Sequence, residues 1–333
     1  MRDAKGFAEV ARILAARGVI HGYSLATRRV YVDDEKKVKF VKQALQEGGY
    51  EFEVVVLPRF FALSQPPSRT GVVRPLMSGV SVGHRDITAG TLSGLAEKGE
   101  ELFIFSNAHV FHSWPLSPNP PYNKSIWQPG PFDASYDFAN EKYYAVADYA
   151  YHVRVRSMYD YSECPVTRTI NWLYKVLGRN SFVITQVQNY VDAAIAKLYG
   201  GVGFEMSTFA VENGEAPREL LDKPFVGLVF AGTQMGHGAI CKLAKYWDKY
   251  FNGYRILFPK YEGAVDVGAG DVIAKDGRTS GFTAASVIDP AASLAVGYYY
   301  DIAWFEDVIL TSADLRTSGG DSGSPAWLWK KAE

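Results

Sequence analysis

Apolar residues recur at helical spacing in two segments near the N-terminus, residues 4–18 and 35–49. A glycine ends the first segment, and a Gly-Gly pair ends the second after an acidic start. These features predict two amphipathic helices. Residues 19–34 and 50–63 are instead strand-like, with apolar positions that alternate with polar ones. The order helix, strand, helix, strand predicts a small α/β domain over residues 1–63.

The pattern changes after residues 64–76, which are rich in Pro, Ser and Gly and predict a linker. From Gly79 onward, short apolar or alternating runs are separated by Gly and Asp. Short strands with turn residues between them predict a mainly β domain, a sandwich or a pair of barrels, over residues 77–333. The stretch from 112 to 183 is rich in aromatic residues and proline, so we expect an elaborated loop with its own helix at residues 166–179.

Composition and charge exclude several classes of protein. The 333 residues include Lys+Arg 35 and Asp+Glu 36, a net charge of −1, which does not favour nucleic acid or an acidic membrane surface as a partner. We find no secretory signal and no apolar run near the ~20 residues that span a bilayer, so we expect a cytoplasmic protein. Cys164 and Cys241 allow one disulfide at most, and neither has the CxxC spacing of a zinc site, so we expect no metal site.

A glycine-rich stretch near the end of the chain, SGGDSGSPAW, holds an Asp-Ser pair between glycines. A nucleophilic serine needs backbone N–H groups near its hydroxyl to stabilise an oxyanion, and glycines allow that approach. Ser322 is the candidate nucleophile, with the N–H groups of Gly320 and Ser322 as candidate oxyanion donors. For this string alone, the alternative is a turn before the strand that starts at Ser324.

Two further strings supply the groups that activate such a serine. In FIFSNAHVF, His109 follows an apolar strand, and in NYVDAAIAKL, Asp192 stands at the start of another. A histidine base and a carboxylate that holds its tautomer complete the requirements for hydrolysing an amide through serine. Taken singly, His109 could be one of six structural histidines, and Asp192 could cap a turn.

Together these strings resemble the active-site strings of the chymotrypsin-like (trypsin-fold) serine endopeptidases, approximately AAHC, DIALL and GDSGGP, in the same order. The likeness is greater to cysteine-poor bacterial and archaeal members. Those carry a K-GRTTG-T strand, similar to AKDGRTSGFTAASV at residues 274–287. The resemblance covers residues 77–333 and implies two six-stranded antiparallel β-barrels, over residues 77–192 and 193–333.

The resemblance also implies a role for each candidate residue. Ser322 is the nucleophile, His109 is the general base and acid, and Asp192 is the orienting carboxylate. Gly320 and Ser322 form the oxyanion hole. The implied substrate is a polypeptide, the reaction passes through an acyl-enzyme, and no cofactor is required. The oligomeric state is not specified by any of these features.

Asp148, in VADYAYHVRV, is a rival for the carboxylate role. The number of residues between His109 and Asp148 is closer to the usual spacing in the family than the number between His109 and Asp192. We prefer Asp192, because the string around it matches better and the loop after His109 can absorb the extra length.

The chain ends soon after Ser322, before a strand that in the family resembles VVGIVSWG and before the closing helix. A similar string, FVGLVFAGTQMGHGAICKLAKYWDKYF at residues 225–251, precedes the serine instead. We expect a circularly permuted second barrel, with Phe230, Ala231 and Gly232 lining the pocket and pairing with substrate. The alternative is an inserted hairpin and helix in a truncated relative.

Two residues near the serine bear on specificity and activation. Arg316, six residues before Ser322, holds a position that in the family often lies at the pocket base, where it would suit an acidic side chain. Asp321 corresponds to the aspartate that binds a newly cut N-terminus in the family. Because a whole domain precedes the barrels, we expect no such activation cleavage. The sequence thus predicts a serine endopeptidase, with a catalytically inactive, protease-like binding or scaffold protein as the alternative.

Overall fold

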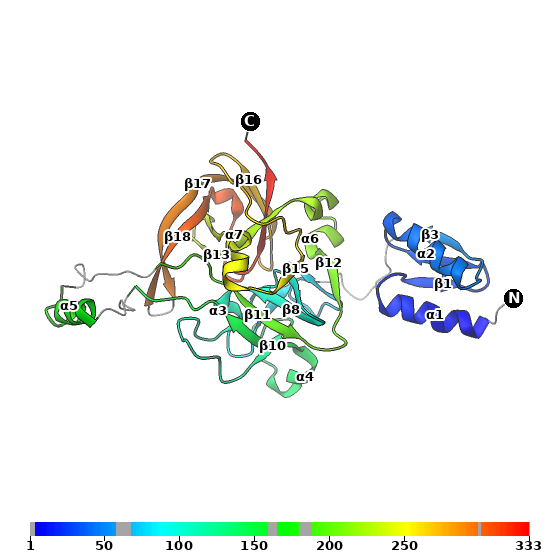
Figure 1. Cartoon of the computed structure of the whole chain (residues 1–333), viewed down its shortest axis with the longest axis horizontal. Coiled ribbons are helices and arrows are strands. Elements are labelled where there is room, and N and C mark those ends of the chain that lie inside the picture. Colours follow the sequence, from blue (N-terminus) through cyan, green and yellow to red (C-terminus); the bar gives the residue numbers. More distant parts are fainter. Residues whose placement is uncertain (1–3, 58–67, 159–164, 180–187, 299–300, 333) are drawn as a thin grey trace. The chain divides into compact units, whose positions relative to one another are not determined.

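The computed structural model describes residues 4–57, 68–158, 165–179, 188–298 and 301–332. The chain divides into two units, Met1–Pro66 and Pro67–Glu333 (Figure 1). The second unit is the larger and is built mainly from β-strands. None of the helices in the described ranges combines the length and apolar character needed to span a membrane.

The first unit contains a three-stranded sheet, with strand order β1-β2-β3, and two helices. Its elements are α1 (Ala4–Ala16), β1 (Gly22–Ser24), β2 (Arg29–Val32), α2 (Glu35–Glu47) and β3 (Glu53–Val56). One apolar stripe of each helix enters the core, where Phe7 of α1 and Val41 of α2 pack in one cluster with Val30. Asp34 caps α2, because its side chain accepts the backbone N–H of Lys36 at 2.8 Å.

The second unit contains an eight-stranded sheet with the strand order β15-β7-β8-β11-β10-β9-β5-β6. Its strands are β5 (Ser81–His84), β6 (Gly90–Thr91), β7 (Gly94–Lys98), β8 (Glu101–Ser106), β9 (Ser125–Trp127), β10 (Ala145–His152), β11 (Ala194–Leu198) and β15 (Arg255–Phe258). Six strands from residues 77–192 were expected. The sheet is larger because β11 and β15 come from later in the chain, and β15 pairs with β7 at the edge. Separately, β4 (Leu76–Ser78) pairs in parallel with β12 (Phe204–Thr208).

The stretch from 112 to 183, expected as a loop, contributes two strands to this sheet, which corrects that expectation. β10 pairs with both β9 and β11. Its sequence looked loop-like because Asp148, Ala150 and Tyr151 are exposed while Val146, Ala147 and Tyr149 are buried, a pattern without regular alternation. The helix expected in this stretch is α5 (Pro165–Val176). The other helices are short: α3 (Ala108–Phe111), η1 (Phe138–Asn140), α4 (Glu141–Tyr144), α6 (Phe209–Glu212), η3 (Arg218–Asp222) and η4 (Ala313–Leu315).

A second sheet of this unit closes into a six-stranded barrel, with the order β13-β14-β18-β17-β16-β19. Its strands are β13 (Phe225–Gly232), β14 (Gly238–Cys241), β16 (Val272–Gly277), β17 (Gly281–Tyr298), β18 (Asp301–Thr311) and β19 (Pro325–Lys330). β13 pairs with β14 on one side and with β19 on the other. Residues 225–232 therefore lie directly beside the strand that follows Ser322. Helix α7 (Leu243–Tyr250) comes after β14.

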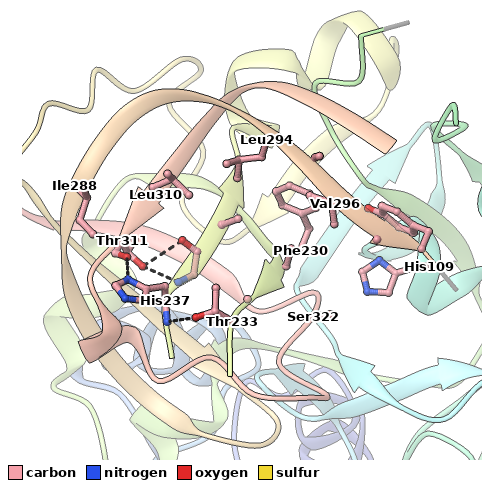
Figure 2. Close-up of a pocket in the computed structure, with 17 residues that line it drawn as sticks. His109, Phe230, Thr233, His237, Ile288, Leu294, Val296, Leu310, Thr311 and Ser322 are labelled. Atoms are coloured by element: carbon pink, nitrogen blue, oxygen red, sulfur yellow. Dashed lines mark hydrogen bonds between the residues drawn. The ribbon is translucent and has the colours of Figure 1, made fainter. Parts of the chain in front are cut away.

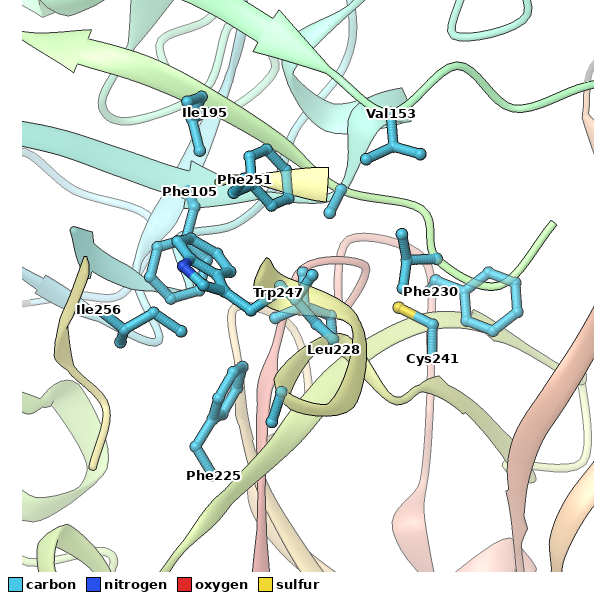
Figure 3. Packing of buried hydrophobic residues seen from close by; sticks show 14 of the residues in the cluster. Phe105, Val153, Ile195, Phe225, Leu228, Phe230, Cys241, Trp247, Phe251 and Ile256 are labelled. Atoms are coloured by element: carbon cyan, nitrogen blue, oxygen red, sulfur yellow. The ribbon is translucent and has the colours of Figure 1, made fainter. Parts of the chain in front are cut away.

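One hydrophobic cluster of the second unit includes residues from both the eight-stranded sheet and the six-stranded barrel (Figure 3). The ring of Phe105, from β8, lies 6.1 Å from the ring of Phe225 in β13 and 5.3 Å from that of Trp247 in α7. All three side chains are buried, and such aromatic pairs add to the free energy gained by burial. Cys241 is a buried free thiol in the same core, whereas Cys164 lies outside the described residues. This shared core fixes the loops at the junction of the two sheets relative to one another.

Candidate active site

Adjacent strands bring His109 and Asp192 together. His109 lies in α3, directly after β8, and Asp192 lies just before β11. β8 and β11 pair antiparallel with Ser106 opposite Ala194, so the end of one strand lies beside the start of the other. The two side chains thus meet although 83 positions separate them along the chain.

The carboxylate of Asp192 is fully buried and accepts four hydrogen bonds. Its Oδ2 accepts the Nδ1 of His109 at 2.6 Å and the hydroxyl of Tyr298 at 2.5 Å. Its Oδ1 accepts the backbone N–H groups of Ala108 at 2.6 Å and His109 at 3.3 Å. Burial alone would raise the pKa of Asp192, but the charge of His109 and these donors outweigh burial and hold that pKa below its ordinary value. The arrangement fixes a charged carboxylate against one imidazole nitrogen.

Asp148, the rival for this role, lies elsewhere. It is an exposed residue of β10, and its carboxylate accepts the hydroxyl of Tyr199 at 2.8 Å. It lines a separate surface cavity together with Tyr199 and Glu141. The structure therefore brings Asp192, and not Asp148, to His109.

Ser322 lies in a tight loop between η4 and β19 that other segments hold by backbone hydrogen bonds. The carbonyl of Ser322 accepts the N–H of Thr91 at 2.8 Å, and Gly323 N–H donates to Val229 at 2.8 Å. Gly323 has a φ of +90°, and a side chain there would meet Ser106 Oγ at 2.1 Å. A side chain would also meet the carbonyl oxygen of Thr91 at 2.3 Å, so only glycine fits here, which explains the second glycine of the GDSG string.

Within the described part of the chain, the Ser322 hydroxyl and the N–H groups of Gly320 and Ser322 make no hydrogen bond. Ser322 and His109 line the same cavity, although no hydrogen bond joins them. Nucleophile and base are often more loosely placed before a substrate binds. No three His, Cys, Asp or Glu side chains gather as metal ligands in the described ranges.

Asp321, next to the serine, is held inside the protein. Its Oδ1 accepts the N–H groups of Thr279 at 2.9 Å and Ser280 at 3.0 Å. Its Oδ2 accepts the Ser280 hydroxyl at 2.6 Å and the Ser318 N–H at 3.0 Å. The ammonium of the buried Lys275 lies 3.9 Å from the same oxygen. Four donors and a cation thus anchor the loop that presents Ser322.

Two cavities open beside Ser322, and Figure 2 shows the residues that line the larger one. The larger, of about 710 Å³, has a mainly apolar wall that includes Leu294, Val296 and Leu310 of the β17–β18 hairpin. The smaller, of about 360 Å³, is polar and is lined by residues of the serine loop and the end of β13: Val229, Ala231, Gly232, Thr233, Gln234, Thr317, Ser318, Gly319, Asp321 and Ser322.

The structure places the four candidate substrate-binding residues differently. Phe230, Ala231 and Gly232 line the larger cavity, and the last two also line the smaller one. Arg316 is exposed, follows η4 in the left-handed conformation, and lines neither cavity. Sequence reasoning missed Tyr298. Nothing in the string AVGYYYDIAW marks one tyrosine as a partner of a distant aspartate.

No model of a known protein family matches the chain, and no curated protein matches it in sequence. Among solved structures, Thermobifida fusca protease A aligns with a TM-score of 0.32 and 9% identity, over 75% of this chain and 76% of that one. A glutamic acid-specific serine protease, whose histidine triad acts in substrate binding, aligns with a TM-score of 0.30 and 12% identity, over 76% of this chain and 92% of that one. At these TM-scores, the case for the site rests on the geometry of its own residues.

Proposed function

We propose that the chain is a serine endopeptidase with Ser322, His109 and Asp192 as its catalytic triad. The observation that carries the proposal is the buried Asp192 carboxylate bound to His109 Nδ1 at 2.6 Å, while His109 and Ser322 line one cavity. A histidine held in one tautomer beside a serine with free N–H groups is the arrangement that amide hydrolysis through serine requires. The N-terminal unit is then an accessory domain.

In this mechanism, Ser322 Oγ attacks the carbonyl carbon of the peptide while His109 Nε2 takes the hydroxyl proton. The N–H groups of Gly320 and Ser322 donate to the oxyanion of the tetrahedral intermediate. The C–N bond then breaks, and His109 gives its proton to the leaving amine. Water attacks the resulting ester, His109 takes its proton and returns it to Ser322, and the carboxylic acid leaves. Asp192 stays ionised throughout and stabilises the imidazolium.

We also propose that the second barrel is a circular permutation of the family's arrangement. The order of strands around the barrel supports this, because β13 lies between β14 and β19 and so beside the serine strand. β13 pairs with β19 over residues 225–228, and its end at Phe230–Gly232 extends beyond that pairing toward the cavities. That end offers backbone groups to an extended polypeptide, which would bind as an added strand.

Labelling by a fluorophosphonate probe, together with cleavage of casein, tests the function. We expect the wild type to be labelled, Ser322→Ala not to be labelled, and Asp192→Asn to be labelled at least about 10³-fold more slowly. Asp148→Asn is the matched control. Asp148 also accepts a tyrosine hydroxyl, that of Tyr199, but it lies outside the site, so the variant should be labelled like wild type. A folded wild type that neither labels nor cleaves would overturn the proposal in favour of an inactive, protease-like binding protein.

A further inference from the structure

The side chain that completes the surroundings of Asp192 comes from the opposite sheet. Tyr298 is the last residue of β17 in the six-stranded barrel, whereas Asp192 precedes β11 of the eight-stranded sheet. The Tyr298 hydroxyl donates to Asp192 Oδ2 at 2.5 Å, the oxygen that also binds His109. Tyr298 is 5% exposed, and its ring meets the imidazole of His109 edge to face, with ring centroids 5.8 Å apart. One tyrosine therefore contacts both the carboxylate and the imidazole.

The hairpin that carries Tyr298 is fastened to the segment leading to Asp192. Asn189, three residues before Asp192, donates its backbone N–H and its side-chain Nδ2 to the carbonyl of Trp304, at 3.1 and 2.9 Å. The carbonyl of Asn189 accepts the N–H of Glu306 at 2.8 Å. Because these bonds fix β18 against the segment of Asp192, the adjacent β17 delivers Tyr298 in a fixed position.

A second set of contacts holds the end of the same hairpin. The carbonyl of Ile302 accepts the N–H of Met158 at 2.7 Å, and the Asp301 carboxylate accepts the Ser157 hydroxyl at 2.6 Å. The ring of Tyr298 also stacks on Phe305, with ring centroids 6.0 Å apart. The phenol therefore has little freedom to leave Asp192.

The lone pairs of a buried carboxylate need hydrogen-bond donors. The imidazole of a triad also needs a carboxylate that does not rotate, because the carboxylate holds the imidazole in one orientation. The phenol of Tyr298 stays neutral and so stays a donor, because burial and the charge of Asp192 raise its pKa well above the ordinary value. Without this hydroxyl, Oδ2 would keep only the bond to His109. The carboxylate would then be free to turn about the axis set by Oδ1.

We propose that Tyr298 is a positioning residue of the triad, which holds the Asp192 carboxylate in the plane that His109 requires. This proposal rests on the proposed function. The same hairpin also forms a wall of the larger cavity, through Leu294 and Val296. The element that contacts substrate thus also fixes the catalytic carboxylate.

Tyr298→Phe removes the hydroxyl and keeps the ring. Tyr246→Phe is the matched control, because the Tyr246 hydroxyl also donates to an aspartate, Asp307 of the same hairpin, at 2.7 Å, away from the triad. We expect Tyr298→Phe to lower kcat and the labelling rate by about 10- to 100-fold, with KM within about twofold. Tyr246→Phe should stay near wild type in both. Replacing Tyr298 with 4-aminophenylalanine keeps a hydrogen-bond donor at the tip of the ring and should restore most of the labelling rate. This variant also tests the proposal if Tyr298→Phe does not fold.

The proton on His109 Nδ1 gives a readout that does not depend on activity. Its low-field NMR signal, assigned by its loss in Asp192→Asn, should move in Tyr298→Phe and stay in place in Tyr246→Phe. A wild type that does not label refutes the proposed function, and the NMR signal then still decides the role of Tyr298. Equal labelling rates for wild type and Tyr298→Phe, together with an unmoved signal, would overturn the role of Tyr298 alone.

Discussion

The ammonium of Lys275 lies 3.9 Å from the carboxylate of Asp321, with side-chain exposures of 0% and 1%. Lys275 also donates to the Ser280 hydroxyl at 2.5 Å and to the Gly281 carbonyl at 3.1 Å. Burial lowers the pKa of Lys275, while the charges of Asp321 and Asp276 oppose that effect. A buried cation in this position compensates the charge of Asp321, the residue that precedes Ser322.

Replacing Lys275 with methionine should therefore destabilise the protein and reduce labelling. The substitution leaves the buried carboxylates of Asp321 and Asp276 without this cation. Removing one partner of a buried ion pair costs about 3–5 kcal/mol of the free energy of unfolding. Urea unfolding measures the loss. Lys331→Met is the matched control, because Lys331 pairs with Asp271 at 3.1 Å while 52% exposed, and such pairs contribute about 1 kcal/mol at most. Equal losses in the two variants would contradict a special role for Lys275.

Activity should not require a cut in the chain. The Asp321 carboxylate already has four hydrogen-bond donors and the Lys275 ammonium within the described residues, so it does not need a newly formed N-terminus. Intact mass measurement of the probe-labelled protein tests this. We expect the mass of the uncut chain plus one probe. Labelling that appears only after cleavage between Ser64 and Val82 would contradict the prediction.

Acid should destabilise the second unit through its buried histidines. Burial lowers the pKa of His112 to about 4. Burial also lowers the pKa of His84 and the pKa of His152, whose Nδ1 lies 2.6 Å from the hydroxyl oxygen of Tyr149. In the unfolded chain these histidines take up protons near pH 6.5, whereas in the folded chain they stay neutral to lower pH. Their contribution to the free energy of unfolding is therefore complete above pH 6.5 and is lost as the pH falls. His112 alone accounts for roughly 3 kcal/mol between pH 7 and pH 4.

Urea unfolding at several pH values between 7.5 and 4.5 measures this slope. His112→Gln removes the titrating group and should flatten the slope relative to wild type, whatever its effect on stability at pH 7.5. His21→Gln is the control, since His21 lies in the N-terminal unit. A wild-type slope that His112→Gln leaves unchanged would contradict the assignment.

Local strings proposed His109, Asp192 and Ser322 as site residues, because each lies close to a strand that the sequence makes recognisable. Asp192 was preferred over Asp148 on its string, and the structure brings it to His109. The spacing along the chain pointed the other way, because a long segment that includes α5 follows β10 and separates it from Asp192. The exposed side chains of β10, Asp148, Ala150 and Tyr151, hid its strand character. A face that contacts solvent does not need the apolar alternation by which strands are recognised.

Tyr298 and Lys275 could not be predicted in the same way. The hydrogen bond of Tyr298 spans 106 positions along the chain and depends on a hairpin crossing from one sheet to the other. Lys275 stands in a strand as a charged residue and is buried only because Asp321 arrives from the serine loop. Both contacts result from tertiary packing, for which neither periodicity nor a motif gives a signal. The strand β15 joins the eight-stranded sheet for the same kind of reason.

The larger cavity should select apolar side chains in the substrate. Leu294 lines it beside His109 and Ser322, and burying a large apolar side chain against such a wall contributes about 1.5–3 kcal/mol. Leu294→Asp should therefore lower kcat/KM by at least about tenfold for peptides with Leu or Phe near the scissile bond. The small fluorophosphonate probe should label this variant within about twofold of wild type, because the triad is unchanged. Ile302→Asp, on the same hairpin but outside the cavity lining, is the control. Equal losses in the two variants, or a parallel loss of labelling in Leu294→Asp, would mean that the change acts through the fold of the hairpin and not through contact with substrate.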